Sequence, residues 1–190
     1  MRIKALTLAL FVGVAIVGCG DAPEPQPTPD PSAEPAAPAE LTSADWLVVD
    51  HDAETVEIEL VAGQSSGNNY WNFNGVHGGA GQITVPAGYE VTINLVNQDP
   101  NMAHSVGVGE RQATYPANFS AVQPVFEGAV TSNPTSLTES TLPGETESIT
   151  FTADAAGDYA LICYVTGHAA AGMWLPFTVS ADGEAGVSGF

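Results

Sequence analysis

Eleven residues near the C-terminal end, from Cys163 to Met173, constrain this chain more than any other stretch. They hold a thiol at Cys163, an imidazole at His168 and a thioether at Met173, with four residues between neighbours. Sulfur ligands select soft metals such as Cu(I), and imidazole also suits copper. A single Cys or Met is by itself more often a buried apolar residue. The three together, at regular spacing, predict a metal site.

Strands are predicted on both sides of this stretch. Residues 157–163 and 173–179 place apolar side chains at every second position, as strands with one buried face do. Cys163 would therefore end one strand and Met173 would begin the next. His168 would lie on the loop between them, flanked by glycines that permit tight bends. The three side chains would then converge at one end of a β-structure.

A metal held by one short loop would be poorly fixed, so a second His is expected from elsewhere in the chain. His104 follows a strongly alternating strand and is the best candidate. Two His and one Cys in a trigonal set, with a weak axial Met, form the blue-copper electron-transfer arrangement. The predicted metal ligands are therefore His104, Cys163, His168 and Met173.

Several stretches resemble sulfocyanin, a member of the cupredoxin family of blue copper proteins. They include the Cys-x4-His-x4-Met loop, Trp-Asn-Phe-Asn-Gly at 71–75 and Ile-Thr-Val-Pro-Ala-Gly at 83–88. The similarity extends over residues 45–180. Two departures are Trp71, where the family has Phe, and Ser105 after the first His, where sulfocyanin tends to carry Asn.

This resemblance implies a cupredoxin-like Greek-key β-sandwich with one type 1 copper ion per chain. It also implies electron transport between redox proteins, with a cytochrome or a terminal oxidase as the kind of partner. Ser105 becomes a candidate to support the copper ligands, and Asn97 a weaker one. The apolar residues Trp174, Ala169 to Ala171 and Pro176 would exclude water and favour Cu(I), so a fairly high reduction potential is expected.

The rest of the chain from residue 45 also reads as β-structure. Alternating stretches occur at 55–60, 82–85, 90–95 and 147–152, and no long helical period is present. Several short strands with turn signals between them predict an all-β sandwich or barrel. Residues 106–145 are rich in Pro, Ser and Thr. Such a long excursion could hold a short helix or cover one side of the metal end.

The N-terminal forty residues are predicted to lie outside this domain. Residues 1–18 combine a basic start with a short apolar run and read as a lipoprotein-type signal peptide. Cys19 would then be lipidated, although an ordinary signal peptide could also contain a Cys. Residues 19–40 are Pro-rich and predict an extended tether. The cupredoxin domain would span 41–190, exported and anchored on the outer side of the cytoplasmic membrane or in the periplasm.

The chain is strongly acidic. Of its three basic residues only Arg111 follows the predicted signal, so the mature chain carries 22 acidic residues against one base, a net charge near −21. This charge excludes nucleic-acid binding by phosphate neutralisation and argues against docking flat on anionic lipid. It is compatible either with a salty environment or with steering of a basic redox partner.

The predicted metal site is compatible with three functions, to different degrees. A membrane-anchored carrier of single electrons, cycling between Cu(I) and Cu(II), is favoured. A copper oxidase or nitrite reductase would need further His ligands, and only His51 and His77 remain, both in turn-like sequence, so no enzyme is predicted. The alternative is a non-redox lipoprotein that binds or delivers copper, which would favour a more exposed site.

Overall fold

The computed structural model describes residues 40–190, which belong to one compact unit. The predicted signal peptide, the lipidated Cys19 and nearly all of the predicted tether lie outside the described residues. These assignments, and the domain boundary at residue 41, therefore stay predictions. In the described part of the chain no helix is long and apolar enough to cross a membrane.

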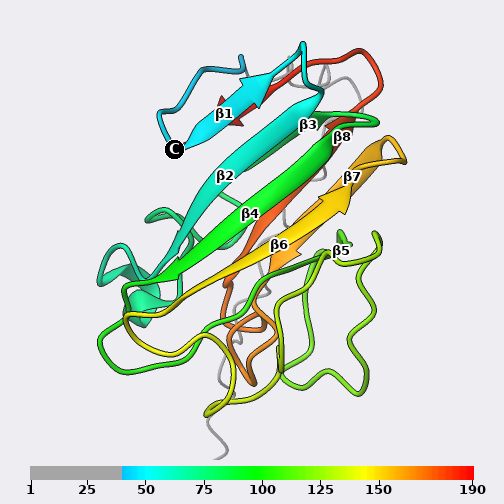
Figure 1. The fold of residues 1–190 in the computed structure, drawn as a ribbon. Coiled ribbons are helices and arrows are strands. Elements are labelled where there is room, and N and C mark those ends of the chain that lie inside the picture. Colours follow the sequence, from blue (N-terminus) through cyan, green and yellow to red (C-terminus); the bar gives the residue numbers. More distant parts are fainter. Residues whose placement is uncertain (1–39) are drawn as a thin grey trace, which may run out of the picture. The chain divides into compact units, whose positions relative to one another are not determined.

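Two β-sheets make up the structure (Figure 1). The first has the order β1-β2-β4-β6 and contains β1 (Leu47–Asp50), β2 (Thr55–Ala62), β4 (Glu90–Asn97) and β6 (Thr146–Thr152). The second has the order β5-β7-β8-β3-β9 and contains β5 (Gly107–Glu110), β7 (Gly157–Ile162), β8 (Trp174–Ser180), β3 (Gln82–Pro86) and β9 (Gly186–Ser188). The pairs β2–β4 and β3–β8 are parallel, and the other pairs are antiparallel. A short 3₁₀ turn, η1 (Gly67–Tyr70), follows β2.

The core lies between the two sheets and is built from alternating strand residues. On β2 the predicted inward positions Val56, Ile58 and Leu60 are all buried. Across the core, Phe151 on β6 meets Phe177 on β8 edge to face, with ring centroids 6.3 Å apart. Burying each such aliphatic or aromatic side chain contributes about 1.5–3 kcal/mol. This packing gives the metal end a rigid base.

The predicted fold class, an all-β cupredoxin-like Greek-key sandwich, is confirmed. The alternating stretches at 55–60, 82–85, 90–95 and 147–152 are β2, β3, β4 and β6, each extended by one or more residues. The turn after β3 carries the chain from one sheet to the other, so β3 and β4 are not hydrogen-bonded neighbours. The short edge strands β1 and β9, and the short β5, were not predicted.

The excursion after β5 covers one side of the metal end, which is one of the two possibilities left open above. Within the described residues, positions 111–145 contain no helix. The carbonyl of Ala117 accepts a hydrogen bond of 2.7 Å from the Gly167 N–H, inside the Cys-to-Met loop. Tyr115 packs edge to face on Trp174, with centroids 5.4 Å apart. The excursion therefore holds the loop from outside.

Candidate metal centre

The strands β7 and β8 set the positions of Cys163 and Met173. They pair antiparallel up to the partners Ile162 and Trp174. The Cys163 N–H then donates to the Met173 carbonyl at 3.1 Å, which continues the ladder by one pair. Inside the loop, the Met173 N–H donates to the His168 carbonyl at 2.9 Å. Cys163 was predicted to end one strand and Met173 to begin the next. In the structure β7 ends at Ile162 and β8 begins at Trp174, so each residue lies one position outside its strand.

His104 lies between β4 and β5, on the connection that joins the two sheets. Its backbone forms an isolated bridge with Thr141: the His104 N–H donates to the Thr141 carbonyl at 3.0 Å, and the reverse bond measures 3.1 Å. Asn97 at the end of β4 donates through Nδ2 to the carbonyls of Met102 and Thr141, both at 2.8 Å. Asn97 thus braces the loop that carries His104 and ties that loop to the segment around Thr141.

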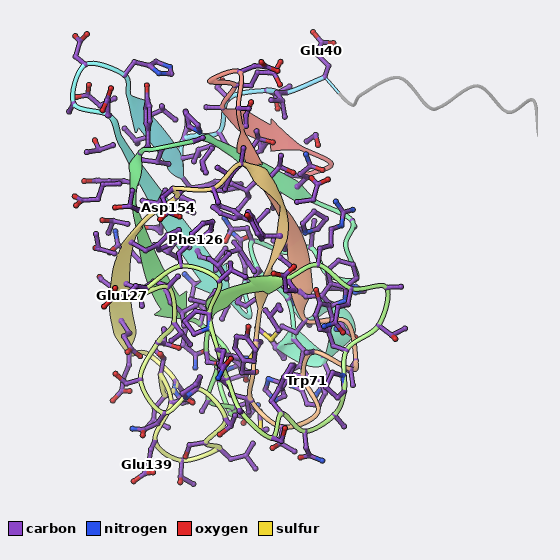
Figure 2. All side chains as sticks on the ribbon, turned by 90° about the vertical axis from the view of Figure 1, so that its right-hand side faces the viewer. Glu40, Trp71, Phe126, Glu127, Glu139 and Asp154 are labelled. Atoms are coloured by element: carbon purple, nitrogen blue, oxygen red, sulfur yellow. The ribbon has the colours of Figure 1, made fainter. Side chains whose placement is uncertain are left out.

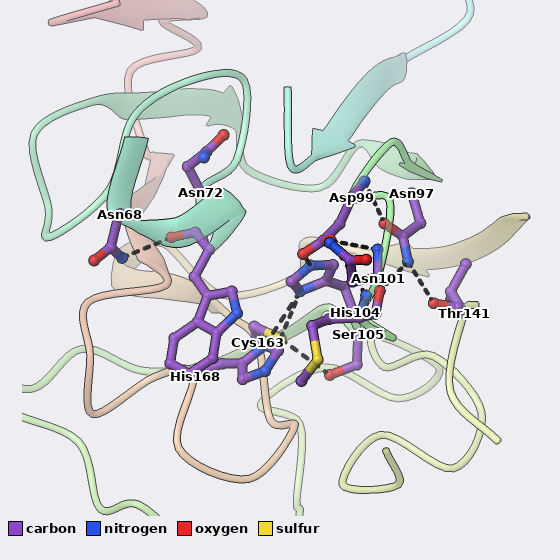
Figure 3. Close-up of polar contacts among 12 residues, drawn as sticks. Asn68, Asn72, Asn97, Asp99, Asn101, His104, Ser105, Thr141, Cys163 and His168 are labelled. Atoms are coloured by element: carbon purple, nitrogen blue, oxygen red, sulfur yellow. Dashed lines mark hydrogen bonds and ion pairs between the residues drawn. The ribbon is translucent and has the colours of Figure 1, made fainter. Parts of the chain in front are cut away.

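Three of the four predicted ligand side chains meet in the interior (Figure 3). Nδ1 of His104 lies 3.2 Å from Nδ1 of His168, and Sγ of Cys163 lies 3.8 Å and 3.5 Å from these two nitrogens. The point equidistant from all three atoms is about 2.0 Å from each, close to metal–nitrogen bond lengths in proteins. All three residues are 0 % exposed. The donor set therefore fits a metal ion without rearrangement.

Met173 is the fourth predicted ligand. It is fully buried in the main core cluster, and its backbone is hydrogen-bonded to that of Cys163. Its position directly before β8 places it at the same end of the sandwich as the three donors. The contact of its sulfur with the ion remains a prediction.

Ser105 contacts the thiol directly. Its Oγ accepts the Tyr164 N–H at 2.9 Å and lies 3.8 Å from Sγ of Cys163. Because the oxygen already accepts that N–H, its own hydrogen is free to point at the sulfur. The resemblance implied this supporting role for Ser105, and the geometry is compatible with it.

Two neighbours of the site were missed in the sequence. Asp99 is buried, and its Oδ2 lies 2.9 Å from Nε2 of His104. Trp71 stacks on His168, with ring centroids 4.1 Å apart and an angle of 20° between the planes. An Asp-Pro pair after a strand is typical of a turn, and Trp71 was noted only as a departure from the family. Neither pattern indicates which ligand the residue contacts.

Burial controls the protonation of the three donors. It lowers the pKa of His168 from 6.5 to about 3, helped by the nearby His104. Burial also lowers the pKa of His104, while the hydrogen bond that His104 donates to Asp99 acts in the opposite direction. Both imidazoles are therefore neutral near pH 7 and have a lone pair for a metal.

The thiol behaves differently from the imidazoles. Burial raises the pKa of Cys163 from 9.0 to about 11, although backbone N–H groups of Ser105 and Val165 oppose this shift. The thiol keeps its proton in the copper-free protein, and binding a metal must displace that proton. Copper loading is therefore expected to release one proton from this residue.

Neither of the remaining two His residues belongs to the cluster of donors. His51 is exposed, with Nδ1 3.0 Å from the hydroxyl of Tyr89, and His77 is exposed as well. Among the described residues, His104, Cys163 and His168 form the one cluster of three or more His, Cys, Asp or Glu side chains with metal-binding geometry. The structure thus assembles no second metal site from the spare His residues in the described part of the chain.

Comparison with known proteins identifies the family. The model of the sulfocyanin (SoxE) domain matches residues 42–186, which include all four predicted ligands. The chain belongs to the sulfocyanin family. The sulfocyanin of Sulfolobus acidocaldarius is 31 % identical over 131 residues, covering 67 % of this chain and 64 % of that protein. The chain thus spans somewhat less than two thirds of the length of this relative.

Solved structures of other copper proteins are also similar. Rusticyanin from Thiobacillus ferrooxidans is 22 % identical, with a TM-score of 0.47 over 72 % of this chain and 87 % of that one. Auracyanin from Roseiflexus castenholzii is 26 % identical, with a TM-score of 0.45 over 65 % and 96 % of the two chains.

The resemblance to sulfocyanins is thus confirmed, and so is the predicted cofactor, one type 1 copper ion. The family match and the donor set of two imidazoles and one thiol, placed within bonding distance of a common point, agree on this ion.

Proposed function

We propose that this protein is a single-electron carrier whose copper is held by His104, Cys163 and His168, with Met173 as a weak axial ligand. The observation that carries the proposal is the buried triangle of two Nδ1 atoms and one Sγ, with sides of 3.2–3.8 Å. When bound there, copper supplies a Cu(II)/Cu(I) couple that accepts and releases one electron. The chain's contribution is to hold one ligand set for both states.

The surroundings of the donors support a carrier rather than an enzyme. All three donor residues and Met173 are 0 % exposed. A catalytic metal site keeps an open position for substrate or water, and this burial provides none on the side of these residues. It also disfavours the alternative of a copper-delivery protein, because delivery requires a ligand that a partner can reach.

Held in place by the core, the donors need little movement on electron transfer. Cys163 and Met173 are joined by a strand-like hydrogen bond, and His104 is bridged to Thr141. The imidazoles are already neutral, so no proton must leave them when the ion binds. Such a preorganised site keeps the cost of changing oxidation state small.

An absorption spectrum of the purified full chain with one equivalent of Cu(II) tests the proposal. We expect an intense visible thiolate-to-copper band, which Cys163→Ser abolishes and Met173→Leu shifts. Met102→Leu is the matched control, because it changes a nearby Met whose predicted role is not that of a ligand. A protein without the band, or one in which only M102L alters it, would contradict the ligand assignment.

The proposed location is the outer side of the cytoplasmic membrane or the periplasm, with a lipid on Cys19. The signal-like residues 1–18 and the Pro-rich residues 19–40 support it. The tether would let the domain reach a redox partner such as a cytochrome or a terminal oxidase. Expression with a labelled fatty acid tests the anchor: the label should enter the wild-type membrane fraction and be lost in Cys19→Ala.

A further inference from the structure

Asp99 is a buried acidic residue beside a copper ligand, and the proposed function does not use it. Its side chain is 1 % exposed, and its Oδ2 is 2.9 Å from Nε2 of His104. Burying a carboxylate costs several kcal/mol unless hydrogen bonds and a suitable partner compensate. In the described residues this contact is the one pair of a basic and an acidic side chain within ion-pair distance.

The carboxylate is held firmly in one orientation. Its Oδ1 accepts the backbone N–H groups of Asn101 at 2.8 Å and Met102 at 3.2 Å. The backbone N–H of Asp99 itself donates to Oδ1 of Asn97 at 2.9 Å. One carboxylate oxygen is thus occupied by the loop, and the other is left for His104.

This orientation decides which nitrogen of His104 carries the proton. A carboxylate only accepts hydrogen bonds, and a neutral imidazole has one N–H. Nε2 must therefore be the protonated nitrogen, and Nδ1 keeps its lone pair. Nδ1 is the atom that faces His168 at 3.2 Å and Cys163 at 3.8 Å (Figure 3).

We infer that Asp99 is a positioning residue of the copper centre, which fixes His104 in the Nε2–H form and strengthens Nδ1 as a donor. This inference rests on the proposed function. A carboxylate hydrogen-bonded to a metal-binding imidazole raises the basicity of that ligand. Its negative charge stabilises Cu(II) more than Cu(I). Asp99 thereby lowers the reduction potential, against the effect of the apolar residues around the site.

The first test uses the copper-free full chain. Long-range ¹⁵N–¹H NMR spectra distinguish the two neutral forms of a His ring. We expect His104 to be in the Nε2–H form alone. In Asp99→Asn the side-chain amide can donate as well as accept, so a mixture of the two forms should appear. Asp154→Asn removes the same charge from an exposed position and should leave the His104 signals unchanged.

The second test uses the copper-loaded protein and potentiometry. D99N should weaken Cu(II) binding by about 10–100-fold, the usual effect of losing such a supporting residue. Cu(I) binding should weaken less. Each tenfold difference between the two corresponds to a rise in potential of about 59 mV for one electron. D154N should leave the potential nearly unchanged. This control separates the local effect of Asp99 on His104 from the effect of a change in net charge.

The outcomes are separable. The inference is overturned if copper-free His104 is in the Nδ1–H form, or if D99N moves the potential no further than D154N does. If D99N does not fold by circular dichroism, the wild-type spectrum alone decides the first point. A wild-type protein that binds no copper would contradict the proposed function. The NMR spectra would still show whether Asp99 fixes the protonated nitrogen of His104.

Discussion

At the scale of single residues, Gly63 decides where Asp99 can lie. Gly63 has a φ of +72°, and a Cβ added there would meet the backbone nitrogen of Asp99 at 2.6 Å. Gly63→Ala must therefore displace Asp99 as well as adopt a left-handed backbone. We expect a loss of about 2 kcal/mol or more in the free energy of unfolding, together with a changed copper spectrum.

Gly88 offers a matched control for this substitution. It has a φ of +88°, and an added Cβ would meet no atom within 4 Å. Gly88→Ala should lose only about 1 kcal/mol, from the backbone conformation alone, and should keep the wild-type spectrum. Urea unfolding of the two copper-free variants measures the difference. Equal losses in the free energy of unfolding, with unchanged copper spectra, would show that the loop around Asp99 can move to accommodate the added methyl group.

The buried imidazoles predict how the copper-free protein responds to acid. The pKa of His168 is about 3 in the folded state against 6.5 for an ordinary His, because of burial and the neighbouring His104. As pH falls below about 6.5 the unfolded chain binds a proton that the folded chain refuses, so the free energy of unfolding decreases until about pH 3. This contribution is fully present above pH 6.5. Unfolding curves of copper-free His168→Asn should fall less steeply with acid than those of the wild type.

At the scale of elements, the turn η1 connects Trp71 to the ligand loop. Asn68, Asn69 and Tyr70 have φ values of 50°, 57° and 64°, three consecutive left-handed residues that are not Gly. Each costs free energy, least for Asn. Nδ2 of Asn68 bonds the carbonyls of Trp71 at 2.8 Å and of Ala171 at 3.0 Å. The strained turn thus places the indole over His168, at the loop end of the sandwich (Figure 2).

Replacing Trp71 tests this covering role. Nε2 of His168 is buried without a hydrogen-bond partner among the described residues. Trp71→Ala should let water reach it, and a chelator should then remove copper about tenfold faster, because the apolar shell limits solvent access. Trp71→Phe, which restores the ring of the family motif, should release copper at nearly the wild-type rate. Equal release from W71A and wild type would mean that the indole does not protect the site.

These elements also show what the sequence could reveal. The spacing of Cys163, His168 and Met173 is local, so the strand–loop–strand arrangement followed from alternation alone. The strand β2 was predicted because its residues 55–60 alternate strictly between the buried core face and the exposed face of the sheet. The contacts of Asp99 with His104 and of Trp71 with His168 depend on how separate loops meet, and no periodic pattern records that. The short strands β1, β5 and β9 have too few residues to show a period.

At the scale of the whole molecule, the core of the sandwich stabilises the metal site, and the surface carries the negative charge. Both sheets contribute to one core cluster, which includes Cys163 and Met173. The metal end is therefore part of the core rather than an appended loop. The surface, in contrast, carries most of the acidic residues without Lys or Arg partners: among the described residues only His104 and Asp99 lie within ion-pair distance of each other.

The unpaired acidic surface predicts a clear dependence on salt. Like charges repel in the compact state, and raising the ionic strength from 0.1 M to 1 M shortens the screening length from about 10 Å to about 3 Å. The melting temperature of the copper-loaded protein should therefore rise by several degrees between these concentrations of sodium chloride. A melting temperature that does not change would show that the carboxylates are too far apart to repel.

The rate of electron exchange separates the two explanations of the acidity. If the acidic surface steers a basic partner, reduction by a cationic cytochrome should slow steeply with salt, whereas reduction by an anionic cytochrome should not.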